Sequence, residues 1–580
     1  MRLHTSLACL LTAILASACT GGQLGIRVES VNEPGALLPQ TLPQEDGTGI
    51  PAGLGLPSPL ELAALNPPDR LASSSHLEAT AYFDDVDTEL PNRNASIDEL
   101  NHFLRMNSDW INTGQAADMA YATFLLDLSE LPQLPCASMG WQKVPQRQDL
   151  LYLGLGNFDS NRWDWYSPQQ PEFVELPGLE QYAGPAGQAY MLVLYLGDDQ
   201  PGLGSVGLGV PWKASEVYKF AADPPQAKHS YDAALVNGNP AVVYVEPGDV
   251  PGKFDVKYSR GLNVFGDDWG FPVVLTSIDD MGTVSMAEVN GKPAVAFQDP
   301  QQDGEGHGTG KLKYIRSIDA NGSVWDDTEI IDSLEDSGHD PVLKVVNGNP
   351  AILFGLEISF IGGFRSAQFV RANDADGTDW PDPISLASVG ANGNADALTP
   401  LTVIDGNPAT LIRNFEGDKL YYIRAMDPDG AEWNFANLVD GAMGQGTQQY
   451  LIEYNGLPAV TYDGSGGDNT LFSAATSTSG ETWSVPQSIS QTFLGVDGGA
   501  RPQGMYVYEG VPQVAIQQWR FHRNVLVHGA DGGTASWSKP EQISCYDLLD
   551  IHSPVLELGA SRHMLYVSGN RLLLSRDTLH

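Results

Sequence analysis

One short phrase recurs from about residue 230 onward, and it limits the folds that are open to this chain. The phrase "VVNGNPAILFG" begins at Val345. Near-copies of it surround Asn237, Asn290, Asp405, Asn455 and Glu509. A repeat of about 50 residues is typical of propellers and solenoids. In each copy an Asn-Gly-like pair separates two apolar runs, and such pairs accept the positive φ angles of a two-residue hairpin, so each copy predicts two antiparallel strands.

A second phrase follows each hairpin and predicts two more strands. "KYIRSIDANGSVW" and "YYIRAMDPDGAEW" are clear copies, in which a polar turn containing Gly stands between an apolar run and a Trp. The Trp residues at this position are Trp269, Trp325, Trp380, Trp433, Trp483 and Trp537. Four antiparallel strands in each unit make the blade of a propeller. We expect the repeated Trp residues to lie in the core between blades.

The last unit, "SPVLELGASRHMLYVSGNRLLLSR", lacks a fourth strand that begins with Trp. The segment "VPWKASEVYKF", which precedes the first unit, predicts that missing strand. A ring closed in this way has no exposed sheet edge. The sequence therefore predicts an all-β chain with a seven-bladed β-propeller over residues 211–580.

The hairpin that contains "TSTSGETW", Thr476 to Trp483, resembles the Asp-box of bacterial neuraminidase (BNR, sialidase-like) repeats, S-x-D-x-G-x-T-W. Thr478 stands where the box has Asp. The resemblance implies a propeller in which the box joins the third and fourth strands, and it does not imply an activity, because the Arg-Ile-Pro motif of sialidases is absent. An arginine recurs at one third-strand position in the units, and we expect it to pair with an acid of the neighbouring hairpin, as Arg316 with Asp319.

The start of the chain, "MRLHTSLACLLTAILASAC", has the short apolar run of a secretory signal over residues 1–18. Its end, "LASAC", resembles the lipobox of bacterial lipoproteins. The resemblance implies that Cys19 is acylated and anchors the protein in a membrane, and ordinary cleavage nearby is the alternative. Thr20 after the cysteine implies, by the lipoprotein sorting rule, the outer membrane of a Gram-negative bacterium. We expect a surface-exposed protein of the cell envelope.

Two further segments precede the propeller. Residues 20–77 contain no aromatic residue and are rich in Gly and Pro, so we expect a disordered tether over residues 19–79. Short apolar runs between turn residues predict a small β-sandwich over residues 80–210. A capping box of Ser96 and Glu99 predicts one helix in "SIDELNHFLRMN". Trp163 and Trp165 share one face of a strand, and we expect a core position, with an aromatic ligand platform as the alternative.

The charge and the cysteines restrict the partners and the compartment. With 72 acidic and 31 basic residues the formal net charge is −41, which argues against binding of nucleic acid. Beyond the signal and the lipidation site, Cys136 and Cys545 remain. In an oxidising compartment this pair forms either one disulfide or two separate buried thiols.

One face of the predicted propeller carries loops that differ from unit to unit. Ligand residues often lie on such variable loops of a regular scaffold. The candidate ligand-binding residues are His229, Tyr231, Asp232, His339, Asp340, Gln448, Arg501, Gln503, Trp519 and His552. The alternative, in which these loops are only unconstrained, stays open.

We expect a monomer that binds a glycan or a surface protein without catalysis, without a cofactor and without a metal site. One alternative is a glycoside hydrolase or lyase, for which Asp232 and Asp340 are the only carboxylate pair that the sequence suggests. Another is a structural scaffold in an envelope complex. The acidic turn from Asn373 to Asp379 leaves a calcium loop open.

Overall fold

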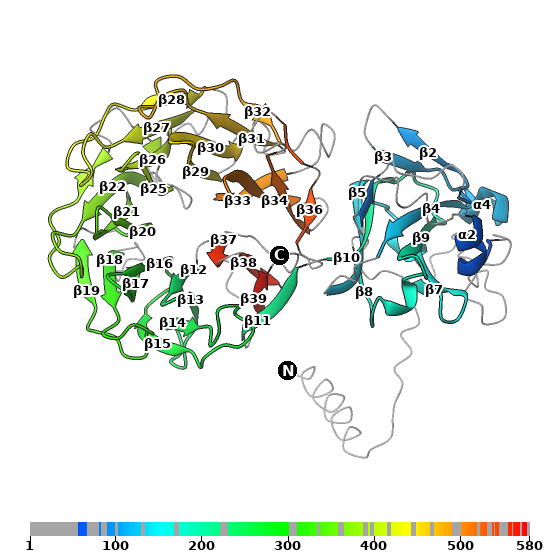
Figure 1. The fold of residues 1–580 in the computed structure, drawn as a ribbon, viewed down its shortest axis with the longest axis horizontal. Helices are drawn as coiled ribbons and strands as arrows, with labels where there is room; N and C mark the ends of the chain where they lie inside the picture. Colours follow the sequence, from blue (N-terminus) through cyan, green and yellow to red (C-terminus); the bar gives the residue numbers. More distant parts are fainter. Residues whose placement is uncertain are drawn as a thin grey trace, which may run out of the picture. The chain divides into compact units, whose positions relative to one another are not determined.

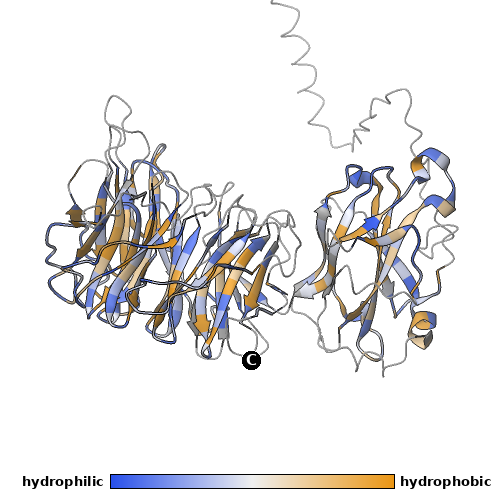
Figure 2. Ribbon diagram, turned by 90° about the horizontal axis from the view of Figure 1, so that it is seen from above, coloured by the Kyte–Doolittle hydropathy of each residue, from blue (hydrophilic) through white to orange (hydrophobic). Residues whose placement is uncertain are grey.

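The computed structural model spans the whole chain, and described in it are residues 56–65, 80–82, 90–98, 103–128, 134–166, 173–210, 212–220, 230–300, 310–332, 334, 337–357, 365–386, 393–394, 400–414, 419–441, 448–464, 469–489, 500–518, 523–529, 536–538, 540–543, 555–558, 561–568 and 571–576. By its internal contacts the chain divides into residues 1–42 and 43–580. Strands dominate the described residues, and most of the hydrophobic residues lie on them (Figure 2). Within these ranges no helix has the length and apolarity that crossing a membrane requires.

The residues before the propeller-like part form two antiparallel sheets. One contains β2 (Ala95–Asp98), β3 (Phe103–Met106), β10 (Gly202–Val210), β5 (Leu134–Lys143) and β8 (Phe173–Glu175), with β1 (Thr80–Tyr82) paired to β10. The other contains β4 (Ala120–Asp127), β9 (Gln188–Tyr195), β6 (Leu151–Asn157) and β7 (Arg162–Tyr166). One buried cluster joins Trp141 and Leu208 of the first sheet to Leu153 and Val193 of the second. The two sheets therefore pack face to face, as the sequence predicts.

The helix predicted in "SIDELNHFLRMN" is wrong, because this segment forms β2 and β3. Leu104 and Met106 are buried and lie two residues apart, so the burial follows the period of a strand. Leu104 pairs with Leu203 of β10. A capping box is a local signal, and here the pairing with a neighbouring strand overrides it.

The predicted tether is also wrong over residues 56–65, where α2 (Pro59–Leu65) packs on the second sheet. Leu62 of this helix is fully buried. The indole N–H of Trp163 donates to the carbonyl of Pro57 over 3.2 Å. Residues 56–65 therefore belong to the folded body.

Trp163 and Trp165 lie opposite Gly156 and Gly154 of β6. In β6 it is the alternate residues, such as Leu153, that face the core between the sheets. The two indoles consequently lie on the other face of the sheet, so the expected core position is wrong. There Trp163 is buried, and Trp165 covers Gly154 closely enough that a Cβ at this glycine would lie 2.9 Å from the ring.

From residue 212 onward the sheets are arranged around a common axis, and in all but the last sheet the first strand lies nearest the axis (Figure 1). Three of these sheets come first in the chain after residue 230. They are β12 (Tyr231–Val236), β13 (Asn239–Pro247), β14 (Phe254–Arg260), β15 (Val273–Ile278); β16 (Val284–Val289), β17 (Lys292–Asp299), β18 (Lys311–Arg316), β19 (Glu329–Asp332); and β20 (His339–Val346), β21 (Asn349–Glu357), β22 (Arg365–Arg371), β23 (Ile384–Ser385). Each is a meander of neighbouring antiparallel strands.

The remaining sheets follow the same order. They are β24 (Gly393–Asn394) and β25 (Leu401–Ile404), both paired to β26 (Asn407–Asn414), then β27 (Leu420–Arg424), β28 (Asn437–Asp440); β29 (Gln449–Tyr454), β30 (Leu457–Asp463), β31 (Thr470–Ala474), β32 (Gln487–Ser488); and β33 (Ala500–Tyr508), β34 (Val511–Gln518), β35 (Arg523–His528), β36 (Glu541–Gln542). First strands of successive sheets touch one another around the axis, and β12 also touches β37 (Val555–Leu558). The arrangement is propeller-like.

The last sheet combines strands from both ends of this part of the chain. Its order is β11 (Lys213–Lys219), β39 (Arg571–Arg576), β38 (Ser561–Ser568) and β37. The prediction that "VPWKASEVYKF" supplies the missing fourth strand is confirmed. Trp212, which precedes β11, is fully buried, and its indole N–H donates to Glu541 Oε1 over 2.8 Å.

The Asn-Gly turns lie at one end of the sheets, which we call the turn end. Asn347 and Gly348 have φ angles of 45° and 83°, as the two-residue hairpin requires. The following proline has no N–H to give to the third strand, and in three sheets the side chain of the preceding residue replaces that donor. The Nδ2 atoms of Asn239, Asn349 and Asn407 donate to the carbonyls of Gly261, Ala372 and Ala425 over 2.8, 2.9 and 2.9 Å.

The repeated Trp residues pack between neighbouring sheets, which confirms their predicted role. Trp433 meets the ring of Phe369 in the preceding sheet edge-on at 5.0 Å, and its N–H donates to the carbonyl of Gly430. The same edge-on contact recurs at Trp325, Trp380, Trp483 and Trp537.

Some of the repeated arginines, such as Arg316 and Arg371, pair with an acid of the neighbouring sheet, although not in the predicted way. Arg316 pairs with Asp376 of the next sheet's hairpin at 2.9 Å, instead of with Asp319 of its own. Its Nε donates to the carbonyl of Val289 over 3.1 Å. Asp319 is occupied inside its own turn, because its carboxylate accepts the backbone N–H groups of residues 321, 323 and 324.

Replacing Asp319 with Ala should lower the free energy of unfolding at pH 7 by roughly 1–2 kcal/mol, since three backbone donors lose a charged acceptor. Partial burial raises the pKa of Asp319, but the backbone hydrogen bonds outweigh it and leave the pKa below its usual value. A depressed pKa gives stability that is present above about pH 4 and is lost as the pH falls through the folded-state pKa. Urea unfolding at pH 7 and pH 3 should therefore show a smaller difference at pH 3. Replacing the exposed Asp382 should change neither value, and equal losses at both pH values would contradict the prediction.

Cys136 in β5 is buried and disulfide-bonded, which favours the bridged alternative over a free thiol. Its partner lies outside the described residues. Because Cys9 and Cys19 belong to the predicted signal and lipidation site, we predict that the partner is Cys545. Peptide mapping of alkylated, non-reduced protein should recover one cross-linked pair of peptides, whereas two alkylated thiols would contradict the bridge.

Candidate functional site

The described candidate residues lie where the first strands of the sheets begin, opposite the turn end. We call this the entry end. The candidates at the entry end are Tyr231, Asp232, His339, Asp340, Gln448, Arg501 and Gln503. His229, Trp519, His552 and the lipidation residue Cys19 lie outside the described residues.

Gln448 and Gln503 are brought together from two neighbouring sheets. The register of β33 against β34 shifts between Pro502 and Gly504, so that Gln503 lies in a bulge. A bulge re-aims a side chain out of the regular alternation. Gln503 Nε2 donates to Gln448 Oε1 over 3.2 Å and lies 3.2 Å from Oε1 of Gln517 in β34. Gln503 is fully buried.

Two more polar residues extend this contact across the sheet. Arg501 pairs with Gln517 in the β33–β34 ladder, and Gln517 pairs with Asn524 in the β34–β35 ladder. Residues directly opposite one another share one face of a sheet, so these three side chains form a line across three strands. We call Gln448, Arg501, Gln503, Gln517 and Asn524 the polar row.

Several buried atoms of the polar row have no hydrogen-bond partner among the residues that the structure describes. They are Nδ2 and Oδ1 of Asn524, Oε1 of Gln503 and Nε of Arg501. Asn524 is 1% exposed. Most buried polar side chains in native proteins have a partner, and leaving one without costs roughly 1–3 kcal/mol. Unpartnered atoms in one small region therefore indicate a place that a ligand or bound water fills.

A buried acid lies next to the polar row and acts on a buried tyrosine. The carboxylate of Asp463, at the end of β30, accepts the backbone N–H of Gln448 over 3.4 Å. Burial, and after it the charges of Asp463 and Tyr231, raises the pKa of Tyr450 well above its usual value. Tyr231 belongs to β12 and Tyr450 to β29, so residues from sheets far apart in the sequence influence one another at the entry end.

The other predicted residues brace the sheets. Asp232 Oδ2 accepts both Ser285 Oγ and the backbone N–H of Met286 at 2.9 Å. His339 Nδ1 lies 3.0 Å from Gln298 Nε2. Asp340 adopts a φ of 48°, and its N–H donates to Thr283 Oγ1. These contacts join the sheets that begin with β12, β16 and β20.

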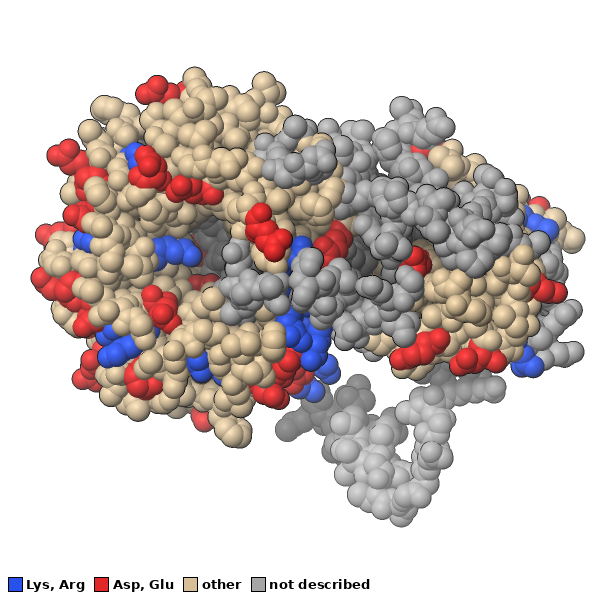
Figure 3. Space-filling model, viewed as in Figure 1, with Lys and Arg blue, Asp and Glu red and all other residues tan. Residues whose placement is uncertain are grey.

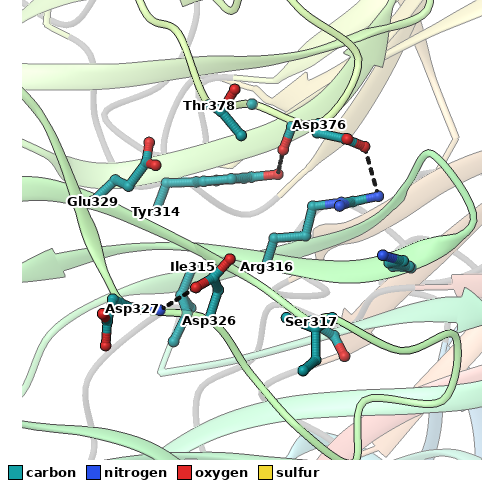
Figure 4. Close-up of a pocket in the computed structure, with 12 residues that line it drawn as sticks. Tyr314, Ile315, Arg316, Ser317, Asp326, Asp327, Glu329, Asp376 and Thr378 are labelled. Carbon is teal, nitrogen blue, oxygen red and sulfur yellow. Dashed lines mark hydrogen bonds and ion pairs between the residues drawn. The ribbon is translucent and has the colours of Figure 1, made fainter.

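A groove of about 160 Å³ lies between the hairpins of two neighbouring sheets (Figure 4). The Arg316–Asp376 pair lies in its wall, and Lys292 stands where other sheets have the asparagine that donates to the third strand. Burial, followed by the charges of Asp374 and Asp326, raises the pKa of Glu329. The groove is lined by contacts that recur between other sheets, so we assign it to the structural scaffold and not to a binding site.

The structure gives no support for a metal centre among the described residues, where no group of His, Cys, Asp and Glu could hold an ion. In the acidic turn from Asn373 to Asp379, the carboxylate of Asp374 instead accepts the N–H groups of Asp376 and Thr378. Acidic side chains are scattered over the visible face of the ring and are not gathered at one point (Figure 3).

Sequence reasoning missed Gln517 and Asn524. Gln517 lies in β34, and Asn524 lies in β35, at the end of a segment, "QWRFHRN", that the sequence predicts as a loop of the binding face. The available signal was "QVAIQQWRFHRN", in which two glutamines in succession, Gln517 and Gln518, end an apolar strand at the position where Asp463 stands in the preceding unit.

No family model matches the chain, and no curated protein matches it. Among solved structures it is similar to YCF48 bound to a D1 peptide, with 13% identity, 64% of this chain and 96% of that chain covered, and a TM-score of 0.40. It is also similar to a mutant Trypanosoma rangeli sialidase that displays trans-sialidase activity, with 17% identity, coverage of 52% and 55%, and a TM-score of 0.34. An α-L-arabinanase of Penicillium chrysogenum complexed with arabinobiose has 9% identity, coverage of 63% and 97%, and a TM-score of 0.34. At these scores the similarities carry no argument about function.

Proposed function

We propose that this protein is a lipid-anchored recognition protein of the cell envelope that binds a glycan or a surface protein at the entry end of a seven-bladed propeller, without catalysis. In this proposal each four-stranded meander is one blade, β24 is an addition to its blade, and the sheet that contains β11 closes the ring. Cys19 carries the anchor. The folded body then begins by residue 56, which leaves a shorter spacer to the membrane than the sequence predicts.

One observation carries the proposal. The turn end is filled by contacts that repeat from sheet to sheet, such as those of Trp433 and Arg316, and these contacts hold the scaffold together. At the entry end the buried polar residues differ from sheet to sheet, and some of them have no partner. Sites on repeat scaffolds are built from such differences between units.

The test uses the full chain with Cys19→Ser, which removes the lipid. We expect saturable binding to a glycan microarray, or to a surface protein captured by crosslinking on cells. Arg501→Glu should weaken this binding by at least about tenfold, because a buried donor becomes an acceptor with a charge. The control is Lys344→Glu, which reverses a charge at an exposed position of β20. Equal binding by both variants would show that the ligand does not bind at the entry end.

A glycoside hydrolase is the second candidate function. The observation that favours it is Asp463, a fully buried carboxylate beside the polar row, because buried acids in such places are candidates for acid–base work. Asp232 no longer supports it, since its carboxylate is held by Ser285 and Met286. Release of reducing sugar by the wild type, lost in Asp463→Asn, would favour hydrolysis over recognition.

A further inference from the structure

We propose that the polar row is a subsite for a neutral carbohydrate, held through its hydroxyl groups by the unpartnered atoms of Arg501, Gln503 and Asn524. This inference rests on the proposed function and names both the position of the site and the class of its ligand. Arg501 and Gln517 are partly exposed, so the row reaches solvent at these two residues, whereas Gln503 and Asn524 are buried.

The mixture of donors and acceptors selects the ligand class. Arg501 Nε and Asn524 Nδ2 donate, whereas Gln503 Oε1 and Asn524 Oδ1 accept. A carboxylate or phosphate offers only acceptors and would leave the two oxygens unpartnered. An ammonium group offers only donors and would leave the two nitrogens unpartnered. A hydroxyl group both donates and accepts, so a ligand with several hydroxyl groups satisfies all four atoms.

The spacing of the row suits a ligand larger than one water molecule. Neighbouring strands lie about 4.8 Å apart, so the line from Arg501 to Asn524 extends over about 10 Å. Arg501 Nε lies at one end of this line and the amide of Asn524 at the other, so a ligand that reaches both spans several hydroxyl groups.

An extended peptide also offers donors and acceptors, but it fits this place less well. Peptides that bind through their backbone add to an exposed sheet edge. Here β34 is paired on both sides, with β33 and β35, and β35 is itself paired with β36. The unpartnered groups are side-chain atoms and not backbone groups of a sheet edge. They therefore favour a ligand with separate hydroxyl groups over an extended peptide.

The experiment compares Gln503→Leu and Asn524→Leu with Gln513→Leu in the full chain carrying Cys19→Ser. Gln513 is a matched control, because it is buried in β34 of the same sheet but lies toward the turn end. Its Oε1 accepts the hydroxyl of Tyr506 over 2.8 Å and Arg562 NH1 over 3.1 Å. The probes are immobilised neutral oligosaccharides of glucose, galactose, mannose, xylose and arabinose, followed by calorimetry with any that bind.

We expect the wild type to bind at least one neutral oligosaccharide. Gln503→Leu and Asn524→Leu should each weaken binding by tenfold or more. Asn524→Leu should leave the melting temperature equal or raise it, because both amide atoms that it removes are unpartnered. Gln503→Leu should lower the melting temperature slightly, because it also removes the hydrogen bonds to Gln448 and Gln517. Gln513→Leu should keep the affinity and lower the melting temperature. If one of the two site variants fails to fold, the other decides.

Two results would overturn the inference. If wild type binds no neutral oligosaccharide, the ligand class is wrong, and a protein captured by crosslinking would then leave the proposed function standing. If an oligosaccharide binds and neither site variant weakens it, the site lies elsewhere. A lower melting temperature in both site variants without any sugar binding would assign the row to structural water.

Discussion

Replacing Trp212 with alanine should lower the free energy of unfolding by about 3–5 kcal/mol, the usual cost of removing a fully buried indole. Trp212 lies in a core cluster that joins Leu526 of one sheet to Tyr566 of the last. The substitution leaves a cavity in that cluster and takes the indole donor from Glu541. The guanidinium of Arg562, whose centre lies 5.3 Å from the indole centroid, loses one of its two aromatic neighbours and keeps Tyr508.

Chemical denaturation followed by tryptophan fluorescence and circular dichroism measures this effect. Trp212→Phe separates its two causes, because phenylalanine fills much of the cavity but cannot donate to Glu541. It should recover part of the loss and not all of it. A loss below about 1 kcal/mol for Trp212→Ala would show that the closing sheet contributes little to stability.

Replacing Trp433 with alanine should lower the free energy of unfolding by about 3–5 kcal/mol as well. This residue lies between two neighbouring sheets of the ring. Trp433 is 8% exposed and packs on Phe369 within a cluster built from two neighbouring sheets. Because every sheet of a closed ring touches two others, we expect one cooperative transition at a lower denaturant concentration, not a separate early step.

A matched control lies two residues away. Phe435 is 80% exposed, so Phe435→Ala should change the free energy of unfolding by no more than about 0.5 kcal/mol. Comparable losses in the two variants would contradict the inter-sheet role of Trp433. A biphasic curve for Trp433→Ala alone would show that the ring unfolds in parts.

Much of the ring could be predicted from the sequence, because its determinants are local and are repeated. Asn237 with Gly238 fixes a hairpin through backbone angles that few other residues accept. The Trp that follows a turn glycine by three residues, as Trp433 follows Gly430, marks the next hairpin and its core position. Even the missing strand could be assigned, since a ring with one incomplete sheet needs a partner from elsewhere in the chain.

The errors came where contacts distant in sequence override local patterns. Ser96 and Glu99 signal a helix start, but β10 offers an edge to which Leu104 pairs as a strand. Trp163 reads as core because it is aromatic and alternates correctly, yet the core lies on the other face of its sheet. The face of this sheet that carries Trp163 is covered by α2. The sequence of α2 lies in the segment that we predicted to be a disordered tether, so this cover could not be foreseen.

The candidate site was only partly predictable for the same reason. Position along each repeat was enough to place Gln448, Arg501 and Gln503 at the entry end. Their contact depends on the bulge at Gln503, which turns that side chain toward the neighbouring sheet. A bulge is not visible in the alternation of the sequence, and Asn524 joins the row only through the register of β35.

The pairing of β11 with β39 also sets an order of events for a newly made chain. Ser215 donates to the carbonyl of Leu574, 359 residues further along, so β11 emerges long before its neighbour exists. Contacts of such sequence separation slow folding, and the waiting chain exposes unpaired strand edges that invite aggregation. Closure of the ring by β39 therefore competes with aggregation of the unclosed chain. A chain that lacks β39 should aggregate or be degraded, and should not persist as a smaller functional ring.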